Sequence, residues 1–212
     1  MPEKEFDKDI SLNTKKIFPF YDPVKQVFDI LFAVISLLVL SPLLILLSLT
    51  IRISGKGPVI YSQDRIGKNG KPFSIYKFRS MVYDAEKGIP RLAGDNGEKV
   101  TRIGSVMRKY RIDEIPNLIN VLKGEMSVVG PRPERRFFID QIVKIAPEYT
   151  ELQTVKPGVT SWGQVKYGYA SSVDEMIKRL DYDLFYMKHR SLWFDLKIII
   201  YTIGTVFKGK GV

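Results

Sequence analysis

Apolar residues are concentrated in one continuous segment near the N-terminus of the chain. Residues 30–51 contain no charged side chain and are nearly all aliphatic, whereas residues 1–20 are mostly polar and of mixed charge. A helix rises about 1.5 Å per residue, so this segment is long enough to cross the hydrocarbon core of a bilayer. It is too long for the apolar part of a cleavable signal peptide, and no small-residue cleavage site follows it. The pattern therefore predicts a polar tail over residues 1–20 and a membrane helix within residues 21–56.

Two features of the apolar segment argue against a simple membrane-spanning helix. Ser41 and Pro42 lie at its middle, where proline removes a backbone hydrogen bond and bends the helix, and where a serine hydroxyl can pair with a freed backbone group. Basic residues flank both ends, with Lys25 before and Arg52 after, so the positive-inside rule gives no clear orientation. A re-entrant helix that enters and leaves on the same side would explain both features. A proline-kinked spanning helix is the alternative.

The pattern changes after the membrane helix, and a second domain is predicted over residues 57–212. Residues 59–66 and 73–79 are typical of two strands joined by a Lys-Asn-Gly-Lys turn. Alternation of side chains along the second strand places Lys77 and Arg79 on the same face. Two cations at the end of a strand could hold a diphosphate, while the alternative is a solvated strand edge.

The rest of this second domain is predicted to be mostly helical. Residues 84–100 are polar and rich in glycine, which predicts a loop that could close over a site. Helical patterns cover the ranges 101–111, 116–123, 134–152, 172–190 and 191–207. The last pattern is interrupted by charges, so we expect a helix that packs on the domain or lies in the membrane interface. The expected fold class is α+β: a membrane helix followed by a small, mostly helical domain with a short β-hairpin and amphipathic interfacial helices.

The composition favours an anionic partner and excludes several kinds of site. The 212 residues include 33 Lys+Arg against 23 Asp+Glu, which gives a formal net charge of +10. Such an excess suits nucleic acid, an anionic membrane surface or phosphorylated substrates. The chain has no cysteine, which excludes disulfides and thiolate nucleophiles. It has one histidine, which is too few for a histidine-rich metal site. Any metal is therefore expected to be a hard cation on oxygen ligands, which favours Mg²⁺.

The segment of residues 111–133, RIDEIPNLINVLKGEMSVVGPRP, contains the most distinctive chemistry. Asp113 and Glu114 precede Pro116, a residue tolerated in the first turn of a helix, and Gly124 is a typical helix stop. The dipole of this helix favours negative charge at its N-terminus and predicts that Asp113 stays ionised at neutral pH. An ionised carboxylate near a bound cation is a competent nucleophile toward phosphorus. Arg132 lies between two prolines, in a rigid turn that fixes the direction of its guanidinium.

Each of these features taken alone has an ordinary explanation, but the whole string closely resembles the signature of the bacterial sugar transferases, also called monotopic phosphoglycosyl transferases. That signature places an Asp-Glu dyad before Pro, Asn-Val-Leu-x-Gly and Met-Ser-x-Val-Gly-Pro-Arg-Pro, and all of these elements stand here in order. The strings around residues 64–67 and 77–81 and over residues 156–165 resemble further parts of the family pattern. Ser161 replaces the more usual glycine in the last string, which puts a left-handed backbone there in doubt.

The resemblance implies the transfer of a sugar 1-phosphate from a UDP-sugar to a polyprenyl phosphate such as undecaprenyl phosphate, with release of UMP. It implies that Asp113 attacks the sugar-bearing phosphorus and forms a covalent aspartyl-phosphosugar, and that Glu114 holds Mg²⁺. It also implies a set of residues that contact the phosphates or the rest of the substrate: Lys77, Arg79, Arg108, Arg132 and Gln164. The resemblance further implies a re-entrant helix with its break at Ser41 and Pro42, in the bacterial inner membrane, with the catalytic domain on the cytoplasmic face.

Two alternatives to this function remain open at this stage. One is a single direct displacement in which Asp113 acts as a base on the lipid phosphate. The other is a non-catalytic, basic, membrane-anchored binding module, which would not account for the Asp-Glu dyad. No known nucleic-acid-binding motif is visible, so nucleic acid is not an expected partner. The sequence identifies neither the sugar nor the exact lipid, and it leaves the oligomeric state open, a homodimer included.

Overall fold

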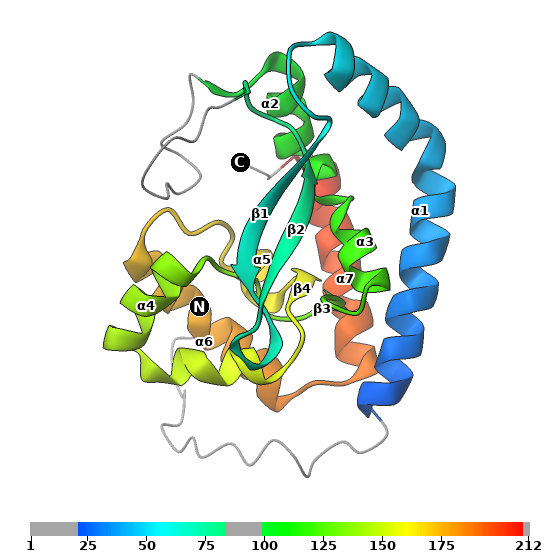
Figure 1. Ribbon diagram of the computed structural model, residues 1–212. Helices are drawn as coiled ribbons and strands as arrows, with labels where there is room; N and C mark the ends of the chain where they lie inside the picture. Colours follow the sequence, from blue (N-terminus) through cyan, green and yellow to red (C-terminus); the bar gives the residue numbers. More distant parts are fainter. Residues whose placement is uncertain (1–20, 84–98, 210–212) are drawn as a thin grey trace.

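A computed structural model describes residues 21–83 and 99–209, with the α+β architecture expected from the sequence (Figure 1). The predicted polar tail and most of the predicted glycine-rich loop lie outside the described residues. The helices are α1 (Tyr21–Ile53), α2 (Arg102–Lys109), α3 (Asn117–Leu122), α4 (Arg136–Ile145), α5 (Trp162–Lys166), α6 (Val173–Lys188) and α7 (Leu192–Phe207). The strands are β1 (Ile60–Ile66), β2 (Pro72–Phe78), β3 (Ser127–Val129) and β4 (Gly158–Thr160).

Helix α1 confirms the predicted long apolar helix, and it continues through the proline. It is the one helix among the described residues that is long and apolar enough to cross a membrane. Pro42 has no N–H to donate to the carbonyl of Leu38, and the hydroxyl of Ser41 donates to that carbonyl at 2.8 Å. The predicted role of the serine is confirmed. In Figure 1 the helix runs along one side of the domain and curves over its upper end. The re-entrant topology remains a prediction.

The first turns of α1 are fastened to the domain by a buried carboxylate on α7, and we call this contact the seam. Tyr21 and Lys25 donate to Oδ2 of Asp195 at 2.8 and 2.9 Å, and Tyr186 donates to its Oδ1 at 2.7 Å. Asp195 is fully buried, so each of these donors satisfies an acceptor that water cannot reach. On α1 itself, Asp29 accepts a hydrogen bond from the backbone N–H of Val128, in β3, at 3.1 Å. Its carboxylate also lies 3.5 Å from the Lys25 amine.

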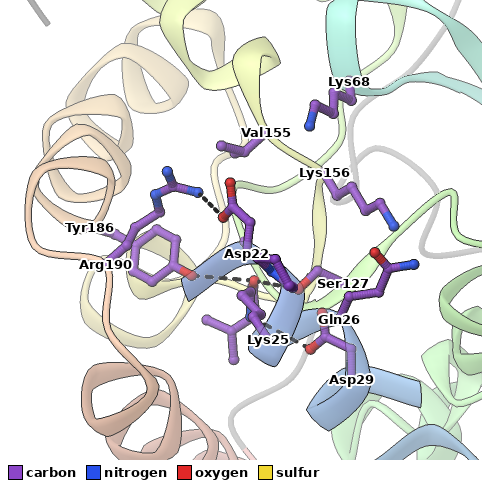
Figure 2. A pocket seen from close by; sticks show the side chains of 13 residues that line it. Asp22, Lys25, Gln26, Asp29, Lys68, Ser127, Val155, Lys156, Tyr186 and Arg190 are labelled. Atoms are coloured by element: carbon purple, nitrogen blue, oxygen red, sulfur yellow. Dashed lines mark hydrogen bonds and ion pairs between the residues drawn. The ribbon is translucent and has the colours of Figure 1, made fainter. Parts of the chain in front are cut away.

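A cavity of about 250 Å³ opens beside the seam (Figure 2). Its charged lining is largely paired within the chain: Arg190 donates to Asp22 at 3.3 Å, and Lys25 is held by the seam. Lys68 and Lys156 complete the basic part of the lining. The cavity is therefore part of the contact by which α1 docks on the domain.

The domain contains two small sheets, one predicted and one not. Strands β1 and β2 form the expected antiparallel hairpin, joined by a turn at Lys68–Gly70. Strands β3 and β4 pair in parallel, although they are far apart in the sequence. Directly after β3, Gly130 meets Gly158 at the start of β4, where a Cβ on Gly158 would lie 2.1 Å from the Gly130 nitrogen. Two of the segments that carry the family signature are thus joined backbone to backbone.

The predicted helices are confirmed with shorter limits, whereas α5 lies where no helix was predicted. The pattern over residues 134–152 becomes α4 and a 3₁₀ turn at Pro147–Thr154, with the interruption where it was expected. Helix α6 packs its apolar side on this unit. Helix α7 buries Ile198 and Ile199 in a second core with α1, α3 and β3. Its other side exposes Trp193 and Phe207 at 77% and 81%. The packed position of α7 is confirmed, and its place in a membrane interface remains a prediction.

Candidate active site

The acidic pair lies in a 3₁₀ turn, Ile112–Glu114, that joins α2 to α3. Both side chains are buried. The turn starts at Arg111, which adopts a left-handed conformation at φ 53° and ψ 22°. A non-glycine residue in this region costs roughly 1 kcal/mol or more, and such residues are common at functional sites. The local backbone is therefore strained two residues before Asp113.

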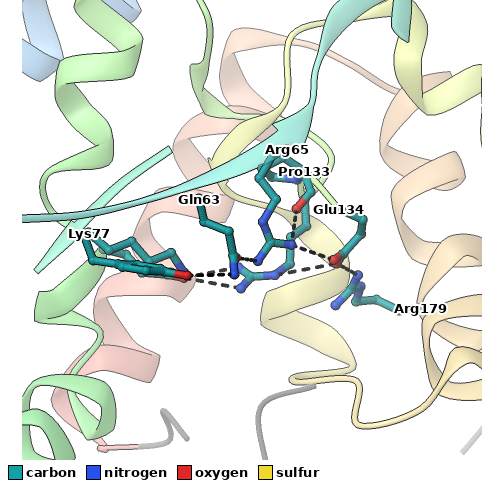
Figure 3. Close-up of polar contacts among 9 residues, drawn as sticks. Gln63, Arg65, Lys77, Pro133, Glu134 and Arg179 are labelled. Carbon is teal, nitrogen blue, oxygen red and sulfur yellow. Dashed lines mark hydrogen bonds and ion pairs between the residues drawn. The ribbon is translucent and has the colours of Figure 1, made fainter. Parts of the chain in front are cut away.

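Two of the predicted phosphate-binding cations converge on Glu114. Lys77, from β2, donates to Oε1 of Glu114 at 2.6 Å. Arg132, from the turn after β3, approaches the same oxygen with Nη1 and Nη2 at 3.4 and 3.3 Å. Figure 3 shows Lys77 on one side of this region, and Arg65 and Arg179 around Glu134 on the other side. The structure therefore brings together three residues that are far apart in the sequence and that were all expected in the site.

The two carboxylates of the pair have pKa values shifted in opposite directions. Burial raises the pKa of Asp113, and the charge of Glu114 raises it further, against the opposing effect of Lys77 and Arg108. Burial also works against ionisation of Glu114, but Lys77 and Arg132 outweigh it and hold the pKa of Glu114 far below its usual range. The expectation that the dipole of α3 would favour the ionised form of Asp113 is not supported. Helix α3 has only six residues, so its dipole is weak beside the cost of burial.

Tyr169 forms one wall of the site, and sequence reasoning did not place it there. The guanidinium carbon of Arg111 lies 4.7 Å from the centre of its ring, and that of Arg132 lies 5.6 Å away. Burial, together with the charge of Glu114, raises the pKa of Tyr169 to about 12, so the phenol stays neutral at physiological pH. The contact joins three distant segments of the chain, and no spacing in the sequence signals it.

The other predicted site residues are placed differently. Arg108 donates from Nε to Ser80 at 2.9 Å, and its charge acts on Asp113, which places it beside the pair. Arg79 instead donates to the carbonyls of Ile51, Gly55 and Lys56 at the end of α1. The geometry gives Arg79 a structural role there and does not bring it to Glu114.

Gln164 lies in α5, with both polar atoms of its side chain buried and without a hydrogen-bond partner in the described part of the chain. Ser161 directly precedes α5 and is extended at φ −139°. Its hydroxyl accepts the backbone N–H of Gln164 at 3.0 Å. The serine therefore serves as a helix cap, and no left-handed backbone is needed. Nothing within residues 21–83 and 99–209 connects Gln164 to Lys77, Glu114 or Arg132. Its contact with substrate remains a prediction.

The donor set suits a magnesium ion that arrives with a phosphorylated substrate. Among the described residues no group of three or more carboxylate or imidazole side chains is gathered for a metal. Lys77 and Arg132 both engage Oε1 of Glu114, so in the described structure Oε2 and the Asp113 carboxylate have no side-chain donor. Mg²⁺ typically binds to one or two carboxylates and completes its coordination with substrate phosphates and water. Asp113 and Glu114 fit that pattern.

Comparison with known families identifies what kind of chain this is. The family model of the bacterial sugar transferases matches residues 20–209. The chain belongs to the bacterial sugar transferase family. The match includes α1, both sheets, the acidic pair and α7, so the site described above is part of the family's common domain.

Individual relatives of this bacterial sugar transferase have informative names. It is 44% identical over 193 residues to the UDP-N-acetylgalactosamine-undecaprenyl-phosphate N-acetylgalactosaminephosphotransferase of Aeromonas hydrophila. This match covers 91% of the present chain and 46% of that protein. It is 38% identical over 208 residues to the UDP-glucose:undecaprenyl-phosphate glucose-1-phosphate transferase of Escherichia coli (strain K12). That match covers 93% of the present chain and 44% of the relative. It is 37% identical over 197 residues to the exopolysaccharide production protein PSS of Rhizobium leguminosarum bv. phaseoli. Here the match covers 89% of the present chain and 98% of the relative. The chain therefore spans about half the length of the first two relatives.

Proposed function

We propose that this protein transfers a sugar 1-phosphate from a UDP-sugar to undecaprenyl phosphate or a similar polyprenyl phosphate, giving a polyprenyl-diphosphate-sugar and UMP. The observation that carries the proposal is the convergence of Lys77 and Arg132 on Glu114, beside Asp113, in a domain fastened to a long apolar helix. The names of the relatives support the same donor and acceptor. The product would serve as the first intermediate of a polysaccharide or glycoconjugate.

The first half-reaction is a displacement at the sugar-bearing phosphorus. The carboxylate of Asp113, whose ionised form Lys77 and Arg108 favour against the effect of burial, attacks this phosphorus, and the bond to the bridging oxygen of the diphosphate breaks. UMP leaves with that oxygen and its electron pair, and an aspartyl-phosphosugar remains. Lys77, Arg108 and Arg132 stabilise the charge that develops on the phosphate oxygens. A Mg²⁺ ion held by Glu114 and the phosphates would neutralise the diphosphate when bound.

The second half-reaction transfers the sugar phosphate to the lipid. A phosphate oxygen of the polyprenyl phosphate attacks the same phosphorus, and the bond to Asp113 breaks, which restores the carboxylate. The lipid phosphate lies at the headgroup level of the bilayer, and insertion of α1 with the exposed apolar side of α7 in the interface would bring the site to the acceptor. We assign the protein to the inner membrane with the catalytic domain on the cytoplasmic face. The re-entrant form of α1 agrees with the basic flanks at both of its ends.

The covalent mechanism can be tested by leaving out the lipid. Purified protein incubated with UDP-sugar and Mg²⁺ should release about one UMP per active site and gain the mass of one sugar phosphate. It should also exchange labelled UMP into the UDP-sugar, because this half-reaction is reversible. Asp113→Asn should abolish all three signals, and Asp140→Asn, at an exposed position on α4, should leave them unchanged.

Two other outcomes are distinguishable. UMP release that begins only when polyprenyl phosphate is added, with no exchange before it, would support direct displacement with Asp113 as a base. Absence of UMP release from every UDP-sugar, with and without lipid, would leave a membrane-anchored binding module.

A further inference from the structure

Besides Asp113 and Glu114, a further buried carboxylate, Glu134, lies next to the site and has no part in the reaction steps above. It is 3% exposed and follows the Pro-Arg-Pro turn directly. Arg179, from α6, donates to its Oε1 at 2.7 Å, and Arg65, from β1, donates to its Oε2 at 3.0 Å (Figure 3). Nε of Arg132 lies 3.8 Å from Oε1. Three guanidinium groups thus surround one carboxylate in the interior of the domain.

The guanidinium of Arg132 has partners at both of its edges and on one face. Its two terminal nitrogens face Glu114, its Nε edge faces Glu134, and its plane lies near the ring of Tyr169. We propose that Glu134 is a positioning residue for Arg132: it holds the Nε edge, so that the terminal nitrogens point at the place where the diphosphate binds. Since an arginine side chain loses considerable conformational freedom when it is fixed, prior fixation reduces the entropy lost on substrate binding.

Glu134 can do this because it is itself held from two elements. Arg65 donates to the Pro133 carbonyl at 3.2 Å and to Gln63 at 2.6 Å, and the Ile66 N–H donates to the Glu134 carbonyl at 3.0 Å. These bonds attach the turn after β3 to β1, while Arg179 attaches the carboxylate to α6. The position of Arg132 therefore depends on β1 and α6 through Glu134.

The charge of Glu134 matters as much as its position. With a neutral side chain here, Arg65, Arg132 and Arg179 would face one another without a shared anion in a buried place. Arg132 already lies 3.3 Å from Glu114, so without the charge of Glu134 it can shift toward Glu114. We expect that shift to misalign Arg132 with the phosphate while the domain stays folded.

A double-mutant cycle tests the positioning role, which rests on the proposed function. Glu134→Gln should lower kcat/KM for UDP-sugar about 10- to 100-fold, as loss of an outer partner of a binding group commonly does. In a protein that already carries Arg132→Lys, Glu134→Gln should lower kcat/KM by no more than about twofold, because the residue through which Glu134 acts has already been altered. The affinity for UMP, measured by calorimetry, should follow the same non-additive pattern. Glu125→Gln, a carboxylate that accepts a hydrogen bond from Asn120 at 2.7 Å, is the matched control and should be close to wild type.

The possible failures are separable. If Glu134→Gln costs the same factor in both backgrounds, or nothing in the wild type, the positioning role is wrong. If Glu134→Gln does not fold, Glu134→Asp keeps the charge with a shorter reach, and the cycle is repeated with it under the same criterion. If the wild-type protein releases no UMP from any UDP-sugar, the proposed function fails, and the UMP affinities alone decide whether Glu134 acts through Arg132.

Discussion

Within the part of the chain that the structure describes, the seam and the site are both clusters of polar residues, and they differ in their balance of charge. In the seam, Asp195 is satisfied by Lys25 and two tyrosine hydroxyls, and Arg190 is paired with Asp22. In the site, the cations outnumber the carboxylates. Asp113, Glu114 and Glu134 lie among a larger set of basic side chains: Arg65, Lys77, Arg108, Arg132 and Arg179. A closed cluster needs nothing further and serves to hold α1 in place. A buried surplus of positive charge is costly unless an anion joins it, which is what a diphosphate would do.

The largest effect that distinguishes the two clusters is expected from Arg132→Lys. Lysine keeps the charge but cannot contact Glu114, Glu134 and a phosphate from one planar group, so kcat/KM should fall about 100-fold with little change in thermal stability. UMP release and the thermal unfolding midpoint, measured on the same preparation, check both parts. The control is Arg136→Lys, an exposed arginine four residues along the chain, which should behave as the wild type. Full activity in the Arg132 variant would remove Arg132 from the site.

The reverse pattern is expected from Asp195→Asn in the seam. Removing the charge leaves Lys25 without its closest anion and weakens bonds to two buried hydroxyls, so the free energy of unfolding should fall by about 3 kcal/mol. The protein that remains folded should keep kcat within about threefold of the wild type, because Asp195 touches none of the site residues. Tryptophan fluorescence during thermal unfolding in detergent measures the first effect. A stable variant with no activity would mean that the seam belongs to the reaction.

The smallest effect is expected from Arg79→Lys. Lysine can replace only part of the bonds from Arg79 to the carbonyls at the end of α1, so stability should fall by roughly 1 kcal/mol, with kcat/KM within about threefold. The comparison with Arg132→Lys is direct, since both changes retain the charge. A loss of activity in the Arg79 variant as large as in the Arg132 variant would return Arg79 to the phosphate clamp.

Much of the fold could be predicted from the sequence because its signals are local. The apolar run, the hairpin turn and the caps at Thr101, Ser172 and Ser191 all act within a few residues of the elements they define. The pairing of β3 with β4 has no such signal. Each of these strands has three residues, and the two are brought together by the close contact of Gly130 with Gly158.

Prediction of the site met the same limit. Strand alternation predicted Lys77 and Arg79 on one face, but β2 ends at Phe78. Arg79 lies beyond the strand, with its side chain at the end of α1. Tyr169 and Glu134 act through contacts across the whole domain. The pKa of Asp113 could not be anticipated either, because it depends on burial, which a sequence motif does not report.

The bond from Ser41 to the Leu38 carbonyl has a consequence for how deeply α1 enters a bilayer. A bend whose freed carbonyl is satisfied by the adjacent residue needs no water, so it is stable in hydrocarbon. The uncharged segment then consists of two arms, residues 30–41 and 42–51, which at 1.5 Å per residue are about 18 and 15 Å long. The hydrocarbon core of a bilayer is about 30 Å thick. Each arm is therefore about half as long as this thickness, which is the length expected if the re-entrant helix proposed above turns at the serine-proline pair.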